Sequence, residues 1–357
     1  MLIQDMPGLV LDLSLITDST VDVRNCPCAQ VSGRGTAALK MTGCANSVIS
    51  DAVVVGTVLG NGAVWNPLRL DSSDGSTVTR TRMLGAPGSE NYLGWRDLAA
   101  WGPVSNIVGA DVRNSRNITF RDCHIRGVLN GLVTGPATRY LGGSIKGYCG
   151  NGAYLISGGV EIVGVKFHDL FTITGHLPVA NQMHPDHIQG FNISYVKNAG
   201  PVFDGVLVEG CDFQSRAYEA DPNWDGIDHP MISNGQIVFI GTPGFSNVTI
   251  RQNYMRGGPD SINGIPVTGA DGVLIEDNIG DWVCTDTRRP IILARSGAKN
   301  VTIRRNIMQK VGADASVVGA IIEDNFDLSG GPAMGNVALT GWVPPAIVRP
   351  AYEPPYG

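Results

Sequence analysis

The chain has 357 residues, a net charge of −6 and only 16 % charged residues, against a usual share of ~25 %. It contains no run of basic residues, which excludes the electrostatic footprint of a nucleic-acid-binding protein. No apolar stretch reaches ~18 residues, so we expect no membrane insertion. Asp12 interrupts the first apolar run. We therefore expect no signal peptide and synthesis in the cytoplasm.

Residues 1–60 are expected to form the first turns or a cap of a repetitive fold, with an early repeat copy at Val21, Val23, Cys26 and Cys28. Residues 61–105 show no clear periodicity, so we expect an irregular lateral insertion there. The main repetitive body is expected over residues 106–328.

One pattern recurs through that body: apolar-x-apolar-x-x-(Asn, Cys or small)-x-apolar. Its copies begin at residues 118, 160, 206, 248, 273 and 301. A period in the twenties with two-residue alternation inside each copy predicts one solenoid turn of short strands per copy. A single turn is too small to bury its own apolar face, but turns stacked ~4.8 Å apart bury one another's. The fifth position of four successive copies is Asn253, Asn278, Asn306 and Asn325. Stacked asparagines can hydrogen-bond amide to amide, which predicts a ladder along the axis.

A second strand is expected after each first one, at 130–135, 151–157, 186–191, 234–241, 263–269 and 289–297. Aligning these segments matches Ile188 with Leu132, Ile265 and Ile291 on the inward face. Asp186 then takes the bend position held by Asn130 and Asn151. Alternation predicts outward side chains for His187 and Gln189.

Two long insertions, 169–185 and 214–233, interrupt consecutive turns. Long loops in a solenoid whose other turns have short connections are typically functional. The segment 329–357 is rich in proline, so we expect an extended tail.

Together these repeats, the asparagine ladder and the Gly-rich bends resemble the pectate-lyase-like superfamily of right-handed parallel β-helix proteins, over roughly residues 15–328. The resemblance implies an all-β solenoid with lateral loop insertions. The superfamily includes lyases, hydrolases, epimerases and non-catalytic spikes, so the resemblance does not select one activity. A softer resemblance, to phage tail spikes or fibres, implies a virion-associated homotrimer that contacts an extended polysaccharide and other virion proteins.

Five of the six histidines lie in or beside the two insertions, which suggests a site. Glycoside hydrolysis needs two carboxyl groups ~5–9.5 Å apart, and we expect Asp186 with Asp228 or Asp225 to supply them. β-Elimination needs a base and a cation instead. His187 is the candidate base, and the candidate cations are Arg216, Arg288, Arg289 and Arg295. The expected catalytic set also includes His229, and the expected substrate-binding residues are His168, His184, Gln189, Arg216, Tyr218 and Trp224.

Several alternatives stay open from the sequence. Asp186 could simply cap a bend, as the asparagines of its sister copies do. We expect no cofactor, although Asp225 and Asp228 could bind calcium, and His184, His187 and His229 could bind zinc. The main functional alternative is a non-catalytic structural or receptor-binding virion protein. A further one is a secreted lyase or hydrolase that has lost its leader.

The outward positions of the second strands predict an apolar flank at Val133, Tyr154, Val238, Pro266 and Ile292. Because such a patch is unusual in contact with water, we expect a second copy of the chain or the C-terminal tail to cover it.

Overall fold

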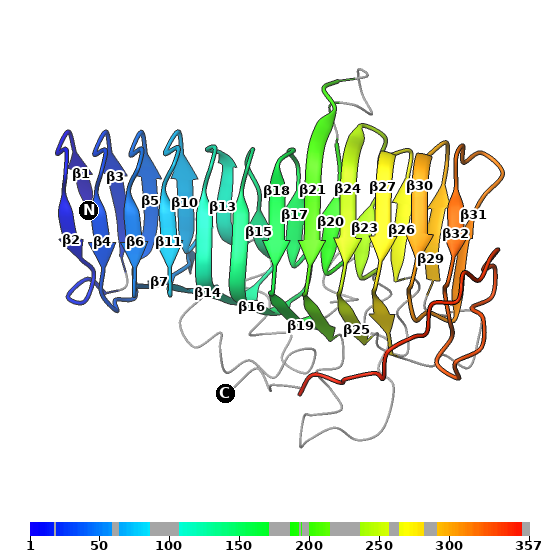
Figure 1. The fold of residues 1–357 in the computed structure, drawn as a ribbon. Coiled ribbons are helices and arrows are strands. Elements are labelled where there is room, and N and C mark those ends of the chain that lie inside the picture. The colour runs from blue at the N-terminus through cyan, green and yellow to red at the C-terminus, as the bar shows by residue number, and fades with distance from the viewer. Residues whose placement is uncertain are drawn as a thin grey trace.

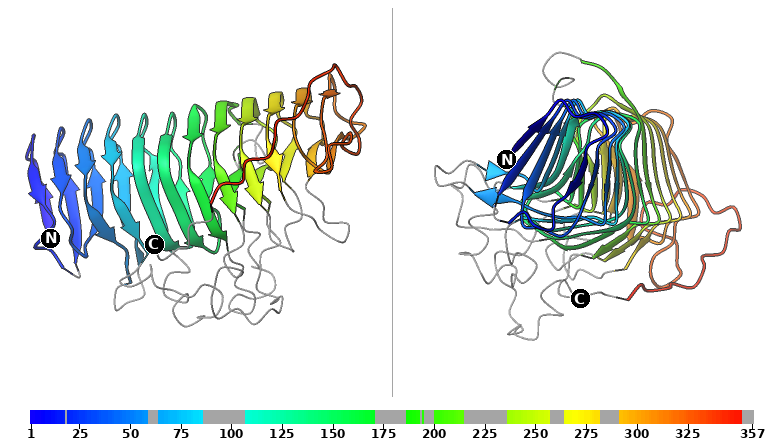
Figure 2. Two further views of the ribbon diagram at one scale, coloured as in Figure 1. Left: turned by 60° about the horizontal axis from the view of Figure 1, so that its bottom comes forward. Right: turned by 90° about the vertical axis from the view of Figure 1, so that its left-hand side faces the viewer.

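The computed structural model describes residues 1–17, 19–58, 64–85, 107–170, 186–192, 194, 200–214, 236–256, 264–281 and 291–351. Over these residues the chain is a right-handed parallel β-helix, a stack of coils that runs from the N-terminal to the C-terminal end (Figure 1). Seen along its axis, the coils superimpose in one cross-section (Figure 2). The predicted solenoid is thus confirmed.

One wall of the stack is a twelve-stranded parallel sheet among the described residues, here called sheet A. In stacking order its strands are β1 (Leu2–Gln4), β3 (Thr20–Arg24), β5 (Ala38–Thr42), β10 (Leu68–Asp71), β13 (Val108–Asn114), β15 (Asn130–Val133), β17 (Ala153–Leu155), β20 (Ile188–Gly190), β23 (Val238–Ile240), β26 (Ile265–Thr268), β29 (Ile291–Arg295) and β31 (Lys310–Ala313).

The other walls belong to an 18-stranded sheet with two arms that meet at a bend. The first arm contains β2 (Val10–Asp12), β4 (Gln30–Ser32), β6 (Val48–Ser50), β11 (Thr77–Thr79), the first halves of β14 (Thr119–Val128) and β16 (Arg139–Tyr148), β18 (Val160–Val163), β21 (Phe203–Glu209), β24 (Phe245–Arg251), β27 (Asp271–Glu276), β30 (Lys299–Arg304) and β32 (Ile321–Glu323). The second arm contains β7 (Val53–Val55), β12 (Arg82–Leu84), the second halves of β14 and β16, β19 (Lys166–Leu170), β22 (Asp212–Gln214), β25 (Tyr254–Arg256) and β28 (Ile279–Gly280). A short antiparallel pair, β8 (Thr57–Val58) and β9 (Val64–Trp65), projects from an early coil.

The core is a set of vertical rows in which each coil contributes one apolar side chain. In the first arm the strand pairings place eleven buried residues in one row: Val31, Ile49, Val78, Phe120, Tyr140, Ile162, Val208, Ile250, Ile275, Ile303 and Ile322. The row explains the recurring sequence pattern, because each coil buries its neighbour's apolar residue.

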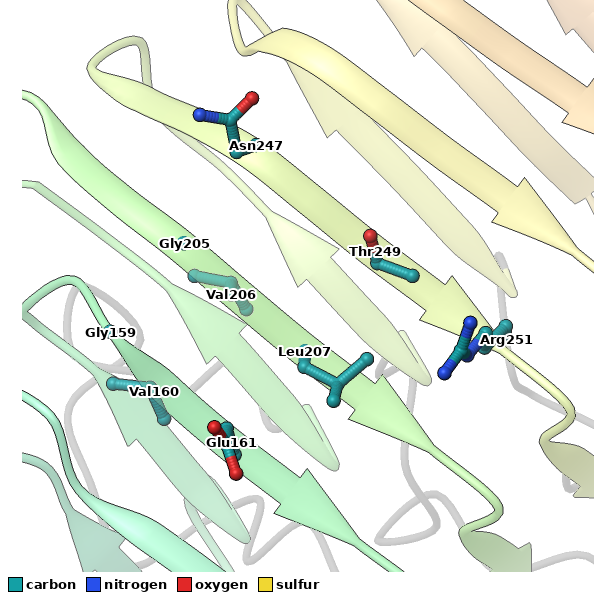
Figure 3. A pocket seen from close by; sticks show the side chains of 9 residues that line it. All are labelled: Gly159, Val160, Glu161, Gly205, Val206, Leu207, Asn247, Thr249 and Arg251. Atoms are coloured by element: carbon teal, nitrogen blue, oxygen red, sulfur yellow. The ribbon is translucent and has the colours of Figure 1, made fainter.

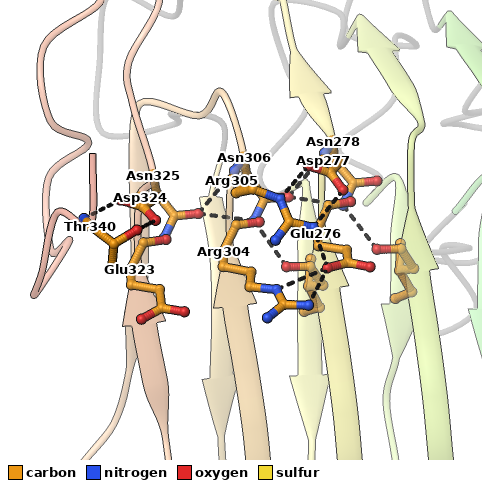
Figure 4. Close-up of polar contacts among 12 residues, drawn as sticks. Glu276, Asp277, Asn278, Arg304, Arg305, Asn306, Glu323, Asp324, Asn325 and Thr340 are labelled. Carbon is orange, nitrogen blue, oxygen red and sulfur yellow. Dashed lines mark hydrogen bonds and ion pairs between the residues drawn. The ribbon is translucent and has the colours of Figure 1, made fainter. Parts of the chain in front are cut away.

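The asparagine ladder forms as predicted at the bend between the two arms (Figure 4). Nδ2 of Asn253 donates to Oδ1 of Asn278 at 2.9 Å, and the same contact joins Asn278 to Asn306 and Asn306 to Asn325. The sequence did not reveal a fifth member, Asn336, whose Oδ1 accepts from Nδ2 of Asn325 at 3.2 Å. The ladder satisfies amide groups that would otherwise be buried without partners.

Two expectations about the N-terminal third were wrong. Residues 64–85 do not belong to an irregular insertion, because β10, β11 and β12 form a regular coil there. The remaining parts of the expected insertion, 61–63 and 86–105, lie outside the described residues. The early repeat copy also belongs elsewhere: Val21 and Val23 lie in β3 of sheet A, paired with Leu39 and Met41.

The C-terminal segment first closes the last coils and then runs back along the body. Met334 and Ala338 form bridges to Lys310 and Glu323, and residues 342–351 contain neither helix nor strand. The guanidinium of Arg349 binds Asp281, just after β28, with contacts of 2.6 and 3.1 Å. This segment is the red tube that runs back across the coils in Figures 1 and 2.

Candidate functional site

The candidate site lies at the corner where the second arm leads into sheet A. The chain segments 86–106, 171–185, 215–235, 257–263 and 282–290, all outside the described residues, connect strands of the second arm to the next strands of sheet A. The predicted insertions therefore attach at a single corner of the cross-section.

Asp186 is part of a second polar ladder at this corner. Oδ1 of Asn130 accepts the backbone N–H of Asn151 at 2.8 Å, and Oδ1 of Asn151 accepts that of Asp186 at 3.2 Å. Oδ1 of Asp186 in turn accepts the N–H of Gln236 at 2.8 Å. Asp186 is fully buried. It thus occupies the bend position that the alignment predicted, with the hydrogen bonding of its asparagine counterparts.

The prediction that His187 points outward was wrong. His187 is fully buried and its ring packs against Phe167 and Phe213, while Nδ1 is hydrogen-bonded to the hydroxyl of Tyr148. The preceding coil has Gly152 here, and a Cβ on Gly152 would approach the rings of Phe167 and Tyr148 to 2.8–2.9 Å. The position therefore faces the interior: it precedes β20, so the alternation of that strand does not apply to it.

Burial has the largest effect on the pKa of His187. Desolvation, assisted by the nearby His168, lowers the pKa of His187 to about 3. The imidazole is therefore neutral at neutral pH. Burial also raises the pKa of the Tyr148 hydroxyl well above its ordinary value, with the charges of Asp169 and Asp186 adding to the effect.

His168 lies on the outer side of the second arm. Alternation in β19 turns Phe167 to the core and His168 to the opposite face, yet His168 is fully buried. Its Nε2 lies 2.9 Å from Oδ2 of Asp212, and both carboxylate oxygens of Asp212 accept from Nε2 of Gln214 at 3.0 Å.

Asp212 and Gln214 were not among the site residues predicted from the sequence. Their place in the repeat was the available signal, because they flank the inward-facing Phe213 directly after the bend. Outward residues of a coil that faces water need only be polar, so two polar residues there are ordinary. Their burial could not be read from that pattern.

Gln189 lies on the outer face of sheet A, as predicted. Strand pairing places Val133, Tyr154, Gln189 and Phe239 in one row across successive coils, and the pairing of the next coils continues that row with Pro266 and Leu293. We call these six residues the sheet A row. Tyr154, Gln189, Phe239 and Leu293 are partly exposed. Gln189 accepts a hydrogen bond from Nδ2 of Asn151 at 2.9 Å.

Two members of the expected apolar flank were misplaced. Val238 and Ile292 are fully buried in the core, and Ile265 pairs with Ile292 rather than with Ile291. The alignment was one residue out of register in β23 and β29, and a one-residue shift exchanges the two faces of a strand. Phe239 and Leu293 take the outward positions.

Seven predicted site residues lie outside the described residues: His184, Arg216, Tyr218, Trp224, Asp225, Asp228 and His229. The expected separation of Asp186 from Asp225 or Asp228, and the calcium and zinc alternatives built on these residues, stay predictions. Within the described ranges, no three His, Cys, Asp or Glu side chains are grouped so that they could hold a metal ion. The described part of the chain also has no helix of the length and apolarity that a bilayer crossing requires.

Comparison with known proteins shows similarity in structure but not in sequence. No protein-family model and no curated protein sequence match the chain. The catalytic unit of the GH87 α-1,3-glucanase from Streptomyces thermodiastaticus superimposes with a TM-score of 0.51 at 12 % identity, covering 96 % of this chain and 63 % of that one. PfbA, a surface adhesin of Streptococcus pneumoniae, gives 0.50 at 11 % identity, covering 99 % and 86 %.

A mutant tailspike protein of E. coli bacteriophage HK620, in complex with a pentasaccharide, gives a TM-score of 0.40 at 10 % identity over 88 % of this chain and 69 % of that one. The fold that the chain shares with the glucanase unit and the adhesin is the right-handed parallel β-helix. The resemblance noted in the sequence is thereby confirmed at the level of the fold. The chain spans less than two thirds of the glucanase unit.

Proposed function

We propose that this β-helix binds an extended polysaccharide along the outer face of sheet A. The observation that carries the proposal is the sheet A row, in which Tyr154, Gln189 and Phe239 stand in register on three successive coils and are partly exposed. A row of this kind repeats its contacts at the coil spacing of ~4.8 Å, which suits a repetitive linear ligand.

The chemistry of the row fits a sugar chain. Aromatic side chains combine an apolar face with polar edges, and such a face suits the C–H face of a sugar ring. Between the two aromatic residues, the amide of Gln189 can donate and accept hydrogen bonds. Burial raises the pKa of Tyr154, against which the charge of the nearby Arg113 acts, so the phenol is a neutral hydrogen-bonding group at neutral pH.

The row changes character along the axis, which limits the proposed track to the middle and C-terminal coils. Towards the N-terminus the same row continues as Asp22, Lys40, Arg69 and Asp111. These charges include both signs, and some form pairs such as Arg69 with Asp71 at 2.7 Å. The apolar part begins at Val133.

The glucanase unit and the adhesin, each with a TM-score of at least 0.5, correspond to two forms of this function: cleavage of a polysaccharide and binding without cleavage. One is named as an α-1,3-glucanase, which acts on a polysaccharide, and the other as a surface adhesin. Binding is the reading that the described residues support, because the carboxylate of Asp186 is buried at a bend. Cleavage by Asp186 with Asp225 or Asp228 stays a prediction.

We further propose, from the sequence resemblance to tail spikes, a virion-associated homotrimer as the setting of this binding. Where Arg349 binds Asp281, the C-terminal segment lies beside the second arm and not over the sheet A row. A second copy of the chain is the competing occupant of the row.

The test is binding to a panel of bacterial exopolysaccharides and capsular polysaccharides, measured by biolayer interferometry. Tyr154→Ala and Phe239→Ala should each weaken binding to the polysaccharide that the unmodified protein binds by about 3- to 10-fold, from stacking of ~0.5–1.5 kcal/mol. Leu274→Ala, a half-buried outward residue of the first arm, is the matched control and should leave binding unchanged. Equal loss in all three variants, or no binding to any polysaccharide, would reject the proposal. A trimer in light scattering that Phe239→Ala dissociates would assign the row to a second copy instead.

A further inference from the structure

A hollow of about 330 Å³ opens on the outer face of the first arm, across β18, β21 and β24. Figure 3 shows Glu161, Leu207, Thr249 and Arg251 around it, with Asn247 at its upper end. This face carries none of the residues used in the proposed function. Its volume lies at the lower end of the ~300–1,000 Å³ range of small-molecule pockets, which suits a single ring rather than an oligomer.

The hollow lies where two consecutive coils have glycine at the same position of the first arm: Gly159 directly precedes β18, and Gly205 lies within β21. Gly159 and Gly205 have φ values of +69° and +78°, a left-handed conformation that glycine adopts without steric cost. The next coil has Asn247 there, at φ +51°. A Cβ on Gly205 would meet no atom nearer than 3.8 Å, so the space beside it is open.

The floor of the hollow is apolar and its edges are polar. Leu207 pairs in register with Glu161 on one side and with Thr249 on the other. All three belong to outward positions and are partly exposed. A carboxylate, a hydroxyl and an amide thus surround one aliphatic side chain, the combination that a ring with one C–H face and several hydroxyl groups requires.

The charges around the hollow are balanced. Glu161 Oε2 lies 2.7 Å from Nε of Arg139, and Glu209 Oε2 lies 3.0 Å from Nη2 of Arg251. Because neither sign prevails, a charged ligand gains little over a neutral one. One donor is unused: Nε of Arg251 is buried and has no hydrogen-bond partner among the residues that the structure describes.

The carboxylate of Asp204, which is bound to the Asn247 side chain at the end of the hollow, is kept in its charged form by hydrogen bonds. Its Oδ1 accepts from the hydroxyl of Ser246 and from Nδ2 of Asn247, each at 2.6 Å. These bonds hold the pKa of Asp204 below its ordinary value. They also fix the Asn247 side chain, so that one edge of the hollow is pre-organised before any ligand enters.

We propose that this hollow is a binding site for a single neutral sugar ring, separate from the sheet A row and independent of the function proposed for it. Leu207 contacts the C–H face of the ring. Glu161 accepts hydrogen bonds from its hydroxyl groups, and Thr249, Asn247 and Arg251 supply the complementary donors.

The experiment is saturation-transfer NMR on the full chain with glucose, galactose, N-acetylglucosamine and glucuronate, each added alone. We expect transfer to at least one neutral sugar and weaker transfer to glucuronate. Leu207→Arg fills the hollow and should weaken binding by about tenfold or more, equivalent to ~1.4 kcal/mol. The fold should accept this arginine, because Arg139 occupies the same row two coils earlier. Thr249→Val removes one hydroxyl without changing shape and should weaken binding less.

Matched controls lie in the same row outside the hollow: Leu274→Arg and Thr302→Val should leave the signal unchanged. In Tyr154→Ala, the part of the signal that Leu207→Arg removes should persist, which separates this site from the sheet A row. The proposal is overturned by an absence of transfer to every neutral sugar, by preference for glucuronate, or by an undiminished signal in Leu207→Arg. Loss of the signal in Tyr154→Ala overturns it as well.

Discussion

The hydroxyl of Tyr148 is hydrogen-bonded to Nδ1 of His187 in the interior of the coil, where neither side chain reaches solvent. The histidine therefore contributes to stability as a neutral ring. Its pKa is lowered to about 3 by burial and by His168, whereas an unfolded histidine titrates near ~6.5. Its contribution is complete above pH ~6.5 and is lost as the pH falls towards the folded value, because the unfolded chain then binds one proton more.

The first prediction concerns this pH dependence. Replacing His187 by Gln should remove a slope of up to about 1.4 kcal/mol per pH unit between pH ~6.5 and ~4. Urea unfolding across that range measures it. Tyr148→Phe is the control: it should cost about 1–3 kcal/mol at every pH, because it removes one buried hydrogen bond but keeps the titrating ring. Parallel curves for the His187→Gln and unmodified proteins would contradict the assignment.

The second prediction concerns the asparagine ladder. In Asn278, Nδ2 donates to Asn306 and to the carbonyl of Ile250, and Oδ1 accepts from Asn253. Asn278→Ala leaves several of these buried groups unsatisfied, so we expect a loss of about 3 kcal/mol or more in the free energy of unfolding.

The matched control for the ladder is an exposed asparagine in a regular strand. Asn114→Ala, which removes one contact to Asp71 at 2.9 Å, should cost about 0.5 kcal/mol or less. Similar losses for the two variants in denaturant titrations would show that the ladder contributes no more than a surface contact.

The third prediction separates the structural role of Asp186 from a catalytic one. Asn in its place retains the oxygen that accepts the Gln236 N–H, so Asp186→Asn should keep the free energy of unfolding within about 1 kcal/mol. Asp186→Ala removes that acceptor and should cost about 1–3 kcal/mol. If the unmodified protein depolymerises a glycan and the equally stable Asp186→Asn variant does not, the carboxylate is needed for chemistry and its role is not structural alone.

The fourth prediction concerns the attachment of the C-terminal segment. Burial alone would raise the pKa of Asp281, but hydrogen bonds from Arg349 and Tyr254 hold it below its ordinary value. The contact is therefore present at neutral pH and is lost only as the pH falls through that lowered pKa. Because Arg349 is 64 % exposed, solvent screens the pair and its contribution to global stability is small.

Its effect should be local. Arg349→Ala should increase hydrogen exchange in residues 342–351 and leave exchange in β27 and β30 unchanged. Arg349→Lys keeps the charge but not the two-point contact, and should give an intermediate rate. Unchanged exchange in the alanine variant would show that other contacts hold the segment.

The fold could be predicted from the sequence because each sequence repeat corresponds to one coil of the β-helix. Asn253, Asn278, Asn306 and Asn325 recur at the same place in successive copies, and a residue that must stack on its counterpart cannot drift in register. Where the bend residues differ, the alignment failed: β23 and β29 were shifted by one position, which exchanged Val238 for Phe239 and Ile292 for Leu293.

The candidate site was less predictable because its residues lie at bends. The alternation rule gave the direction of Gln189 inside β20 but not that of His187, which precedes the strand. The polar position of Asp186 was predictable because asparagine holds it in the two preceding coils. The His168–Asp212 contact joins residues 44 positions apart, and only the spatial pairing of β19 with β22 reveals it.

The row of core residues from Val31 to Ile322 has a consequence for how such a protein can change size. Each coil pairs only with the coil above and the coil below, so a duplication or loss of one whole repeat, such as the 25 residues from Asn253 to Asn278, leaves the remaining junctions intact. The body would grow or shrink by ~4.8 Å per event. Gain or loss of whole repeats would therefore change the length of the β-helix only in discrete steps, and with it the distance between its two ends.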